Sequence, residues 1–344
     1  MNLRQALDAF LPLIEEELQA CVVPTQDGAP AYFGMMQYHM GWKDEHFDPA
    51  VATTGKRIRP LLTLLACQAA GGEARQALPA CAAVEIIHNF SLVHDDIEDR
   101  SDTRRGRRTV WSRWGEAQAI NVGDGMFALA HLALHRMPHF GVPPERVTPA
   151  LRLLDETCLA LCQGQHLDIA FENVHDVDVD GYVRMIVGKT AALLGCAAQL
   201  GALVATTEWQ TLERYRHIGL ALGLAFQMQD DVLGIWGEAA VTGKPVADDI
   251  RSRKKTLPVV YVLERPDDAI AARLRALYAH SPMTESDVTE AVMILDAAGA
   301  REHTERLAGH YLDRGLTEIE TAQPEPEAGA ALRELAHFLV QRAF

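Results

Sequence analysis

The sequence predicts an all-α protein, built as a single large bundle of helices. Segments with apolar residues spaced three and four apart fill most of the 344 residues, whereas alternating runs rich in Val, Ile and Thr, which are typical of strands, are scarce. Helices of this number and length, joined by short connections, favour one bundle whose central helices are buried on most sides. No break is long enough to be a domain linker, so we expect a single domain over residues 1–344.

Each helical segment ends at a cluster of Gly, Pro or polar residues. Met1–Ala20 is expected to form an amphipathic helix, and its three central glutamates argue against a signal or transit peptide. Thr190–Thr207 is the longest uncharged run, but it holds Gln199 and threonines at both ends, so we interpret it as a buried helix and not as a membrane span. The expected breaks are Pro24–Pro30, Gly71–Glu73, Pro138–Pro144, Val174–Gly181, Gly237–Pro245, Arg265–Asp268, Ser281–Thr284 and Gln323–Glu327.

The composition limits the classes of function. The formal net charge of −15 argues against a nucleic-acid partner, because binding of a phosphate backbone needs a basic face. The six cysteines include no CxxC pair, and a chain of this length does not need disulfides for stability. We therefore expect a protein of the reducing cytoplasm.

An acidic motif ends the segment Val84–Asp99. At about 100° per residue, Asp95 and Asp99 lie one turn apart on one helix face, with Asp96 beside them and His88 on the same face. A bound cation would remove the repulsion between these carboxylates, and magnesium suits them because it takes hard oxygen ligands and keeps positions for water and substrate phosphates. The alternative is an ordinary solvated helix end. Four arginines that could bind a diphosphate follow directly and disfavour it: Arg104, Arg105, Arg107 and Arg108.

A second acidic motif, FQMQDDVLG, places Gln227, Asp230 and Asp231 on one helix face. The two acidic faces could confront each other across a cavity. Basic clusters lie between and around the two motifs; each alone is weak evidence. They are GKRIRP with Lys56, Arg57 and Arg59, GKT with Lys189 and Thr190, TGKP with Lys244, and RKKTLP with Lys254 and Lys255.

Two other motif interpretations fail or are weak. Gly188-Lys189-Thr190 could end a nucleotide-binding loop, but the glycine required five positions before Gly188 is Val183. His131 and His135 are four residues apart and could form a metal pair. No glutamate follows His131 and apolar residues surround the pair, so ordinary helix packing is favoured.

Taken together, GKRIRP, LVHDDIEDRSDTRRG, GQHLD, GKT, FQMQDD and KKTLP resemble, in order and spacing, the motifs of the trans-type isoprenyl diphosphate synthases. The resemblance is strong over Gly55–Pro258. YHMGW near the start and LAHFLVQRAF at the end resemble the flanking helices of that family more weakly. The resemblance implies an all-α fold of mainly antiparallel helices around a central active-site cavity, usually as a homodimer, with the two aspartate motifs facing each other at the cavity mouth.

The resemblance also implies a role for individual residues. Asp95, Asp99 and Asp230 would bind two or three magnesium ions that hold the allylic diphosphate, and Asp96 and Asp231 would support them. Residues matching those that grip the allylic diphosphate are Arg104, Lys189, Gln227 and Lys254, together with Thr190. Residues matching those that bind isopentenyl diphosphate are Lys56, Arg59, His88 and Arg105, and further substrate-binding residues are Gln165, Asp168 and Lys244.

One position departs from the family pattern. Where the family usually has a third aspartate in its second motif, this chain has Gly234. Asp248 and Asp249 follow shortly before KKTLP, so our hypothesis is that metal binding survives with a changed set of neighbouring carboxylates.

The implied reaction is the magnesium-dependent condensation of isopentenyl diphosphate with dimethylallyl, geranyl or farnesyl diphosphate. It needs no side-chain nucleophile, because fixed charge stabilises the leaving diphosphate while positive charge develops on the allylic carbon. Product length is expected to depend on the cavity beneath Asp95. In the family, an aromatic residue such as Phe90 five positions before this aspartate, with a small residue such as Ser91 at the fourth, is typical of geranylgeranyl diphosphate synthases; farnesyl or longer products are the alternatives.

Three rival interpretations remain. A terpene cyclase shares the helical fold and one aspartate motif, but it has no need of the second diphosphate site that Lys56, Arg59 and Arg105 would form. A non-catalytic subunit that regulates a synthase is supported only by Gly234. A purely structural helical protein explains none of the charge placement.

Overall fold

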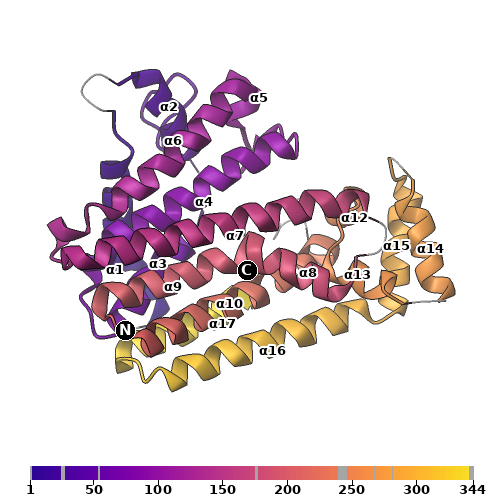
Figure 1. Ribbon diagram of the computed structural model, residues 1–344. Helices are drawn as coiled ribbons and strands as arrows, with labels where there is room; N and C mark the ends of the chain where they lie inside the picture. Colours follow the sequence, from indigo (N-terminus) through magenta and orange to yellow (C-terminus); the bar gives the residue numbers. More distant parts are fainter. Residues whose placement is uncertain are drawn as a thin grey trace. The chain divides into compact units, whose positions relative to one another are not determined.

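The computed structural model describes residues 2–24, 28–52, 55–174, 177–238, 246–265, 268–280 and 282–340. These residues form helices almost throughout, so the all-α prediction is confirmed (Figure 1). The helices before the second aspartate motif are α1 (Leu3–Cys21), α2 (Pro30–His39), α3 (Ile58–Ala69), α4 (Leu78–Glu98), α5 (Val110–Trp114), α6 (Glu116–Leu134), α7 (Val147–Asn173), α8 (Val179–Ile186) and α9 (Ala192–Ala205). They are followed by α10 (Trp209–Trp236), α12 (Asp248–Arg251), α13 (Leu257–Leu263), α14 (Ala269–Tyr278), α15 (Glu285–Ala297), α16 (Ala300–Thr321) and α17 (Pro326–Val340).

The chain divides into two compact units. The first comprises Met1–Glu156, Cys196–Tyr215 and Gln323–Leu332, and the second comprises Thr157–Gly195, Arg216–Ala322 and Arg333–Phe344. The polypeptide passes from one to the other within α7, α9, α10 and α17 and in the connection between α16 and α17. The single-domain organisation stays a prediction, and each unit is described by itself.

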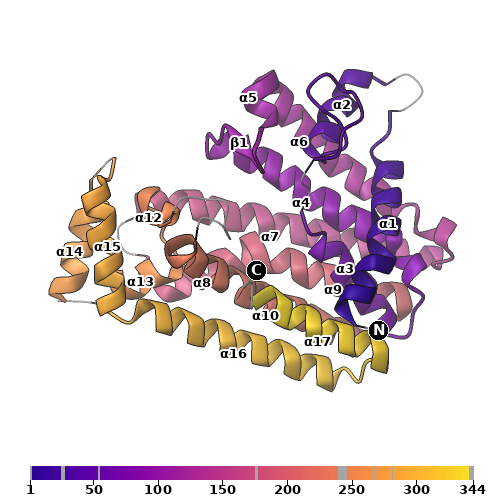
Figure 2. The same cartoon turned by 180° about the vertical axis from the view of Figure 1, so that it is seen from behind.

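The core of the first unit is built on α4. This helix packs against α6, α3 and α1, and both ribbon views show α4 and α6 side by side (Figures 1 and 2). Its N-terminal half is buried from Leu78 to Ile87 and is apolar except for Glu85, as expected for a central helix. A glycine permits the close approach of α6, because a Cβ on Gly123 would overlap the His94 imidazole.

The second unit has two apolar clusters around α13. One joins Tyr182 of α8 and Met228 of α10 to Leu257 of α13. The other joins Val259 and Val262 of α13 to buried residues of α14 and α15. Because α13 also packs against α16, it lies within the core of this unit.

The predicted breaks agree to within a few residues with the helix ends that the structure describes, whereas residues 25–27, 175–176, 239–245, 266–267 and 281 of these breaks lie outside the described residues. Several connections were missed. Residues 40–52, 55–57, 99–109 and 252–256 also lie between α-helices, and Thr103–Arg104 and Arg107–Arg108 form two short antiparallel strands, β1 and β2. Segments Ala74–Glu98 and Val179–Ala205 are long and apolar enough to cross a bilayer, but 72% and 78% of their apolar windows are buried inside the protein. Length and composition alone are therefore weak evidence for a membrane span.

Candidate active site

The first aspartate motif lies at the C-terminal end of α4, as predicted. Asp95 is half-buried, Asp96 is buried, and the exposed Asp99 caps the helix by donating its backbone N–H to the Asp95 carbonyl at 2.8 Å. Carboxylates at a helix C-terminus face the negative end of the helix dipole, so their charges are unfavourable there without a cation. The position of these carboxylates therefore favours a role in binding a cation over a role in stabilising the helix.

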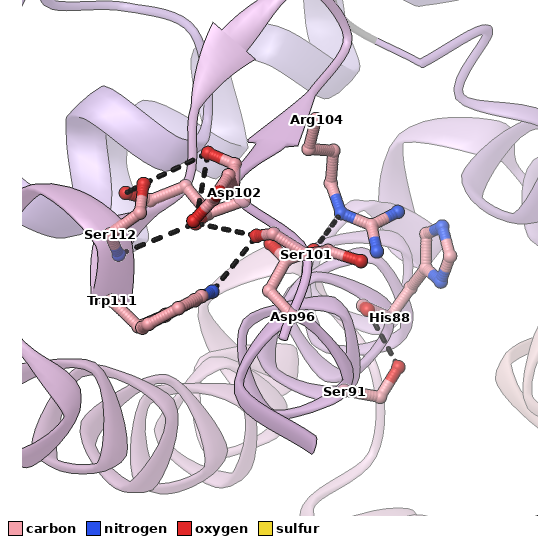
Figure 3. Close-up of polar contacts among 9 residues, drawn as sticks. His88, Ser91, Asp96, Ser101, Asp102, Arg104, Trp111 and Ser112 are labelled. Carbon is pink, nitrogen blue, oxygen red and sulfur yellow. Dashed lines mark hydrogen bonds and ion pairs between the residues drawn. The ribbon is translucent and has the colours of Figure 1, made fainter. Parts of the chain in front are cut away.

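Asp96 is held by the first of the arginines that follow it. Arg104 Nε donates to Asp96 Oδ1 at 2.8 Å, while Asp96 Oδ2 is buried without a hydrogen-bond partner (Figure 3). Burial raises the pKa of Asp96 to about 6, and the neighbouring Arg104 opposes that shift. Its free oxygen is thus available to another donor or a cation.

A tight hairpin presents the arginines. Thr103 pairs with Arg108 and Arg104 with Arg107, so Arg105 and Gly106 form a two-residue turn with positive φ angles of 53° and 75°. The base of the hairpin is fixed by Trp111, whose indole N–H donates to the Ser101 carbonyl at 2.8 Å (Figure 3). A left-handed backbone conformation is uncommon at a residue other than glycine, and Arg105 adopts it. Residues held in such conformations cluster at functional sites.

The GKRIRP segment places its three cations differently. Arg57 is buried and forms ion pairs with Glu15 and Glu85, both at 2.7 Å, so it serves the structure of the unit. Lys56 is exposed and Arg59 is half-buried. The guanidinium of Arg105 packs against Gly55, where an added Cβ would lie 3.0 Å from a terminal nitrogen. Arg105 and GKRIRP, which are far apart in sequence, are therefore neighbours.

His88 lies within the same group of cations. Burial lowers its pKa well below the usual value, and the positive charges of Arg59, Arg105 and Arg104 lower it further. The imidazole is therefore neutral at physiological pH. The two arginines lie near enough to act on His88, and the prediction that Arg59, His88 and Arg105 bind one diphosphate stays a prediction.

The predicted length-determining residues occupy one turn of α4. The Phe90 ring makes edge-on contacts with Phe127 of α6 at 5.5 Å and with His94 at 5.4 Å between ring centroids. The Ser91 hydroxyl donates to the His88 carbonyl at 2.8 Å. Phe127 was missed by sequence reasoning because only tertiary packing brings its helix to Phe90.

His131 forms no pair with His135. Its Nε2 lies 2.6 Å from Asp155 Oδ1, and its Nδ1 lies 2.8 Å from the Phe127 carbonyl. Both nitrogens thus have protein partners, which agrees with the packing interpretation.

In the second unit, Asp231 is the centre of a buried network. Its carboxylate accepts from the Tyr182 hydroxyl, from the Leu257 backbone N–H at 2.8 Å and from Gln227 Nε2 at 3.1 Å. Thr190 in turn donates to Gln227 at 2.8 Å. Burial raises the pKa of Asp231 to about 7 against the effect of these bonds. Tyr182 carries no motif and could not have been found from sequence.

Lys189 lies in a π-helical segment, Val187–Ala191, between α8 and α9. Such segments occur often at functional sites. The Lys189 ammonium forms an ion pair with Asp168 of α7, which brings two predicted substrate-binding residues together. The segment approaches α7 closely, because a Cβ on Gly164 would overlap the Lys189 backbone nitrogen.

The remaining predicted residues of this unit fall in different places. Asp230 and Gln165 are half-buried on α10 and α7, and Lys254 is exposed before α13. Lys255, by contrast, donates to the Phe171 carbonyl at 2.6 Å and has a structural role. Lys244 lies outside the described residues.

The carboxylates fit a magnesium site that substrate completes. Within the described residues, no three His, Cys, Asp or Glu side chains are grouped so that they could hold a metal by themselves. Magnesium typically uses one or two carboxylates and fills its other positions with water and phosphate oxygens. The unpaired Oδ2 of Asp96 and the hard oxygens of its neighbours suit that chemistry.

Comparison with known proteins agrees with these features. Residues 41–295 match the model of the polyprenyl synthetase family. A geranylgeranyl diphosphate synthase of Mycobacterium tuberculosis is 43% identical over 295 residues, covering 85% of this chain and 83% of the relative. A (2E,6E)-farnesyl diphosphate synthase of the same organism is 39% identical over 313 residues, covering 90% and 85%. The crystal structure of a polyprenyl synthetase from Streptomyces coelicolor superposes with a TM-score of 0.90 at 34% identity, covering 98% of this chain and 100% of that one.

The fold, the two aspartate motifs and the arginine hairpin thus define a prenyltransferase of the isoprenyl diphosphate synthase class. The chain belongs to the polyprenyl synthetase family. Within it, the chain is a short-chain trans-isoprenyl diphosphate synthase, as the sequence motifs predicted.

Proposed function

We propose that this synthase condenses isopentenyl diphosphate with allylic diphosphates and that geranylgeranyl diphosphate is its main product. The observation that carries the product assignment is the position of Phe90, one turn and a residue below Asp95, where its ring meets that of Phe127. Two aromatic rings at this depth would close the cavity to longer chains, whereas Ser91 leaves room beside them. The relatives include both geranylgeranyl and farnesyl synthases, so the proposed choice between the two products rests on this ring pair.

Magnesium is the proposed cofactor, with two or three ions per site. Asp95, Asp99 and Asp230 would hold the ions, supported by Asp96 and Asp231. When bound, magnesium neutralises the leaving diphosphate of the allylic substrate. Asp96 is oriented by Arg104, and Asp231 is oriented by Tyr182 and Gln227, so each motif has a supporting residue fixed by hydrogen bonds.

The chain's own cations would bind the two diphosphates. Arg104, Lys189 and Lys254, with Gln227 and Thr190, would hold the allylic diphosphate, and Asp168 would orient Lys189 in the free enzyme. Lys56, Arg59, His88 and Arg105 would bind isopentenyl diphosphate. The neutral state of His88 suits it to donate an N–H to a phosphate oxygen.

A homodimer is the proposed assembly, formed through α6. This helix exposes the apolar side chains Ile120 and Leu132, which are 43% and 59% exposed. A subunit interface would remove these apolar side chains from water. Light scattering of Ile120→Asp/Leu132→Asp should show a monomer, and an unchanged mass would place the interface elsewhere.

The proposed compartment is the cytoplasm, which suits six cysteines that form no disulfide.

Product analysis tests the function directly. Purified protein is incubated with isopentenyl diphosphate and each allylic primer, with magnesium and then with chelator. A magnesium-dependent product of twenty carbons is expected. A shorter or longer product would retain the class and overturn the Phe90 assignment, and no elongation with any primer would support the non-catalytic subunit.

A further inference from the structure

His39 ends α2 in the YHMGW segment, and this segment is tied to the arginine hairpin. The Arg107 guanidinium stacks on the Tyr38 ring at 3.9 Å and donates to the Tyr38 and Lys43 carbonyls at 3.1 and 2.7 Å. The Tyr38 hydroxyl donates to the Arg108 carbonyl at 2.9 Å. These contacts fix the backbone on either side of His39 to the hairpin that carries Arg104 and Arg105.

His39 lines a small cavity beneath this hairpin. The cavity of about 30 Å³ is lined by His39 together with Asp96, Arg104 and Arg105, among others. A space of this size accommodates about two water-sized groups, so it can receive the oxygens of a phosphate at its mouth. The cavity belongs entirely to the first unit.

One imidazole nitrogen of His39 has no partner at ordinary hydrogen-bond distance. His39 Nε2 is buried in this state, and so is Oδ1 of Asn89, the polar side chain that interacts with the imidazole. Buried polar atoms are normally paired, so an unpaired one that lines a cavity between two arginines indicates a ligand. Burial lowers the pKa of His39 to about 3, with Arg104 and Arg105 adding to the effect, while Asn89 opposes it in part. The imidazole is therefore neutral and carries one N–H.

We propose that His39 is a substrate-binding residue, whose Nε2–H donates to a non-bridging oxygen of the isopentenyl diphosphate held by Arg105 and His88. His88 and His39 lie close enough to influence each other electrostatically, so a diphosphate bound beside His88 would also lie near His39. The family match begins at residue 41, so it assigns no role to His39. The proposal rests on the proposed function, because it names one more contact of the same diphosphate site.

The decisive substitution is His39→Phe, which retains the ring and removes both nitrogens. Loss of a hydrogen bond to a charged group predicts a rise in KM for isopentenyl diphosphate of about tenfold to a hundredfold. The KM for farnesyl diphosphate should stay within about twofold. His39→Gln restores an N–H donor and should recover part of the loss. The matched control is His46→Phe, an exposed histidine of the same loop region.

Binding measured without turnover separates this proposal from the proposed function. Calorimetry with inorganic pyrophosphate in the presence of chelator should show weaker binding to His39→Phe than to the wild type and to His46→Phe, at equal melting temperature. Equal pyrophosphate binding and an unchanged KM for isopentenyl diphosphate would overturn the role of His39. An equal rise in both KM values, with no recovery in His39→Gln, would overturn it too. A wild-type protein that elongates no primer would instead refute the proposed function.

Discussion

The side chain of Asp249 occupies the space that a side chain at Gly234 would need. A Cβ added to Gly234 would overlap Oδ2 of Asp249, so the two positions cannot both carry a carboxylate without movement. Asp249 also lies close enough to raise the pKa of Asp231. The carboxylate absent from the second motif is thus replaced, in space, by one from α12.

This relationship predicts that Gly234→Asp harms the enzyme, although it restores the family pattern. The new side chain must displace Asp249, and overpacking of this kind costs about 1–3 kcal/mol. Magnesium affinity and melting temperature should fall, whereas Gly234→Asp/Asp249→Gly should recover both. Asp249→Ala alone should weaken magnesium binding. Full activity and magnesium affinity of Asp249→Ala, with unchanged folding, would show that Asp249 does not compensate.

Removal of the aromatic ring at position 90 should lengthen the product. Phe90→Ala would open the cavity that we propose beneath Asp95, but the Phe127 ring would remain beside it. We expect a partial shift beyond twenty carbons for Phe90→Ala and a larger shift for Phe90→Ala/Phe127→Ala. Chromatography of dephosphorylated products measures this, with Phe90→Tyr as the control that retains the ring. An unchanged product in the double variant would remove both rings from the length-determining role.

Substitution of the two arginines of GKRIRP should have different effects, on stability for Arg57 and on substrate binding for Arg59. Arg57→Ala leaves the buried Glu85 without its partner and should lower the free energy of unfolding by about 3–5 kcal/mol. Arg59→Ala should change stability little and raise the KM for isopentenyl diphosphate. Chemical unfolding together with KM measurements distinguishes the two. A specific KM effect for Arg57→Ala at full stability would contradict its structural assignment.

The close contact between Gly164 and the Lys189 backbone predicts that substitution of Gly164 harms the enzyme. Gly164→Ala should displace the π-helical segment, lowering both stability and kcat, because the added methyl overlaps the Lys189 backbone. The matched control is Gly309→Ala in α16, where nothing lies within 4 Å, and it should be neutral or stabilising by up to about 1 kcal/mol. Equal effects at the two positions would show that the approach of α7 is unimportant.

The buried histidines should make stability depend on pH. The pKa of His39 is lowered to about 3, so the unfolded chain binds a proton more readily and stability falls as pH drops below about 6.5. The slope is about 1.4 kcal/mol per pH unit for one such group. Asp96 acts in the opposite sense, because its pKa is raised. The difference between wild type and His39→Gln isolates the histidine: its unfolding free energy should fall less steeply between pH 6 and pH 4, and identical slopes would contradict the pKa shift.

The sequence alone determined the helical fold, the aspartate motifs and the class of reaction. Helical periodicity placed Asp95 and Asp99 on one face, because residues three or four apart on a helix must be neighbours. The order and spacing of six motifs then indicated the family, which the comparisons confirmed. These features depend on local geometry or on residue order, and both can be inferred from a single chain.

Only the tertiary structure decided which residues meet across long separations. Arg105 against Gly55, Asp249 against Gly234 and His39 beneath the arginine hairpin depend on how helices and loops pack. The same holds for Arg57, whose burial between Glu15 and Glu85 makes it a structural residue in a basic motif whose other cations, Lys56 and Arg59, were predicted to bind substrate. These contacts depend on how the shapes of many buried side chains fit together. Periodicity along the chain carries no information about that fit.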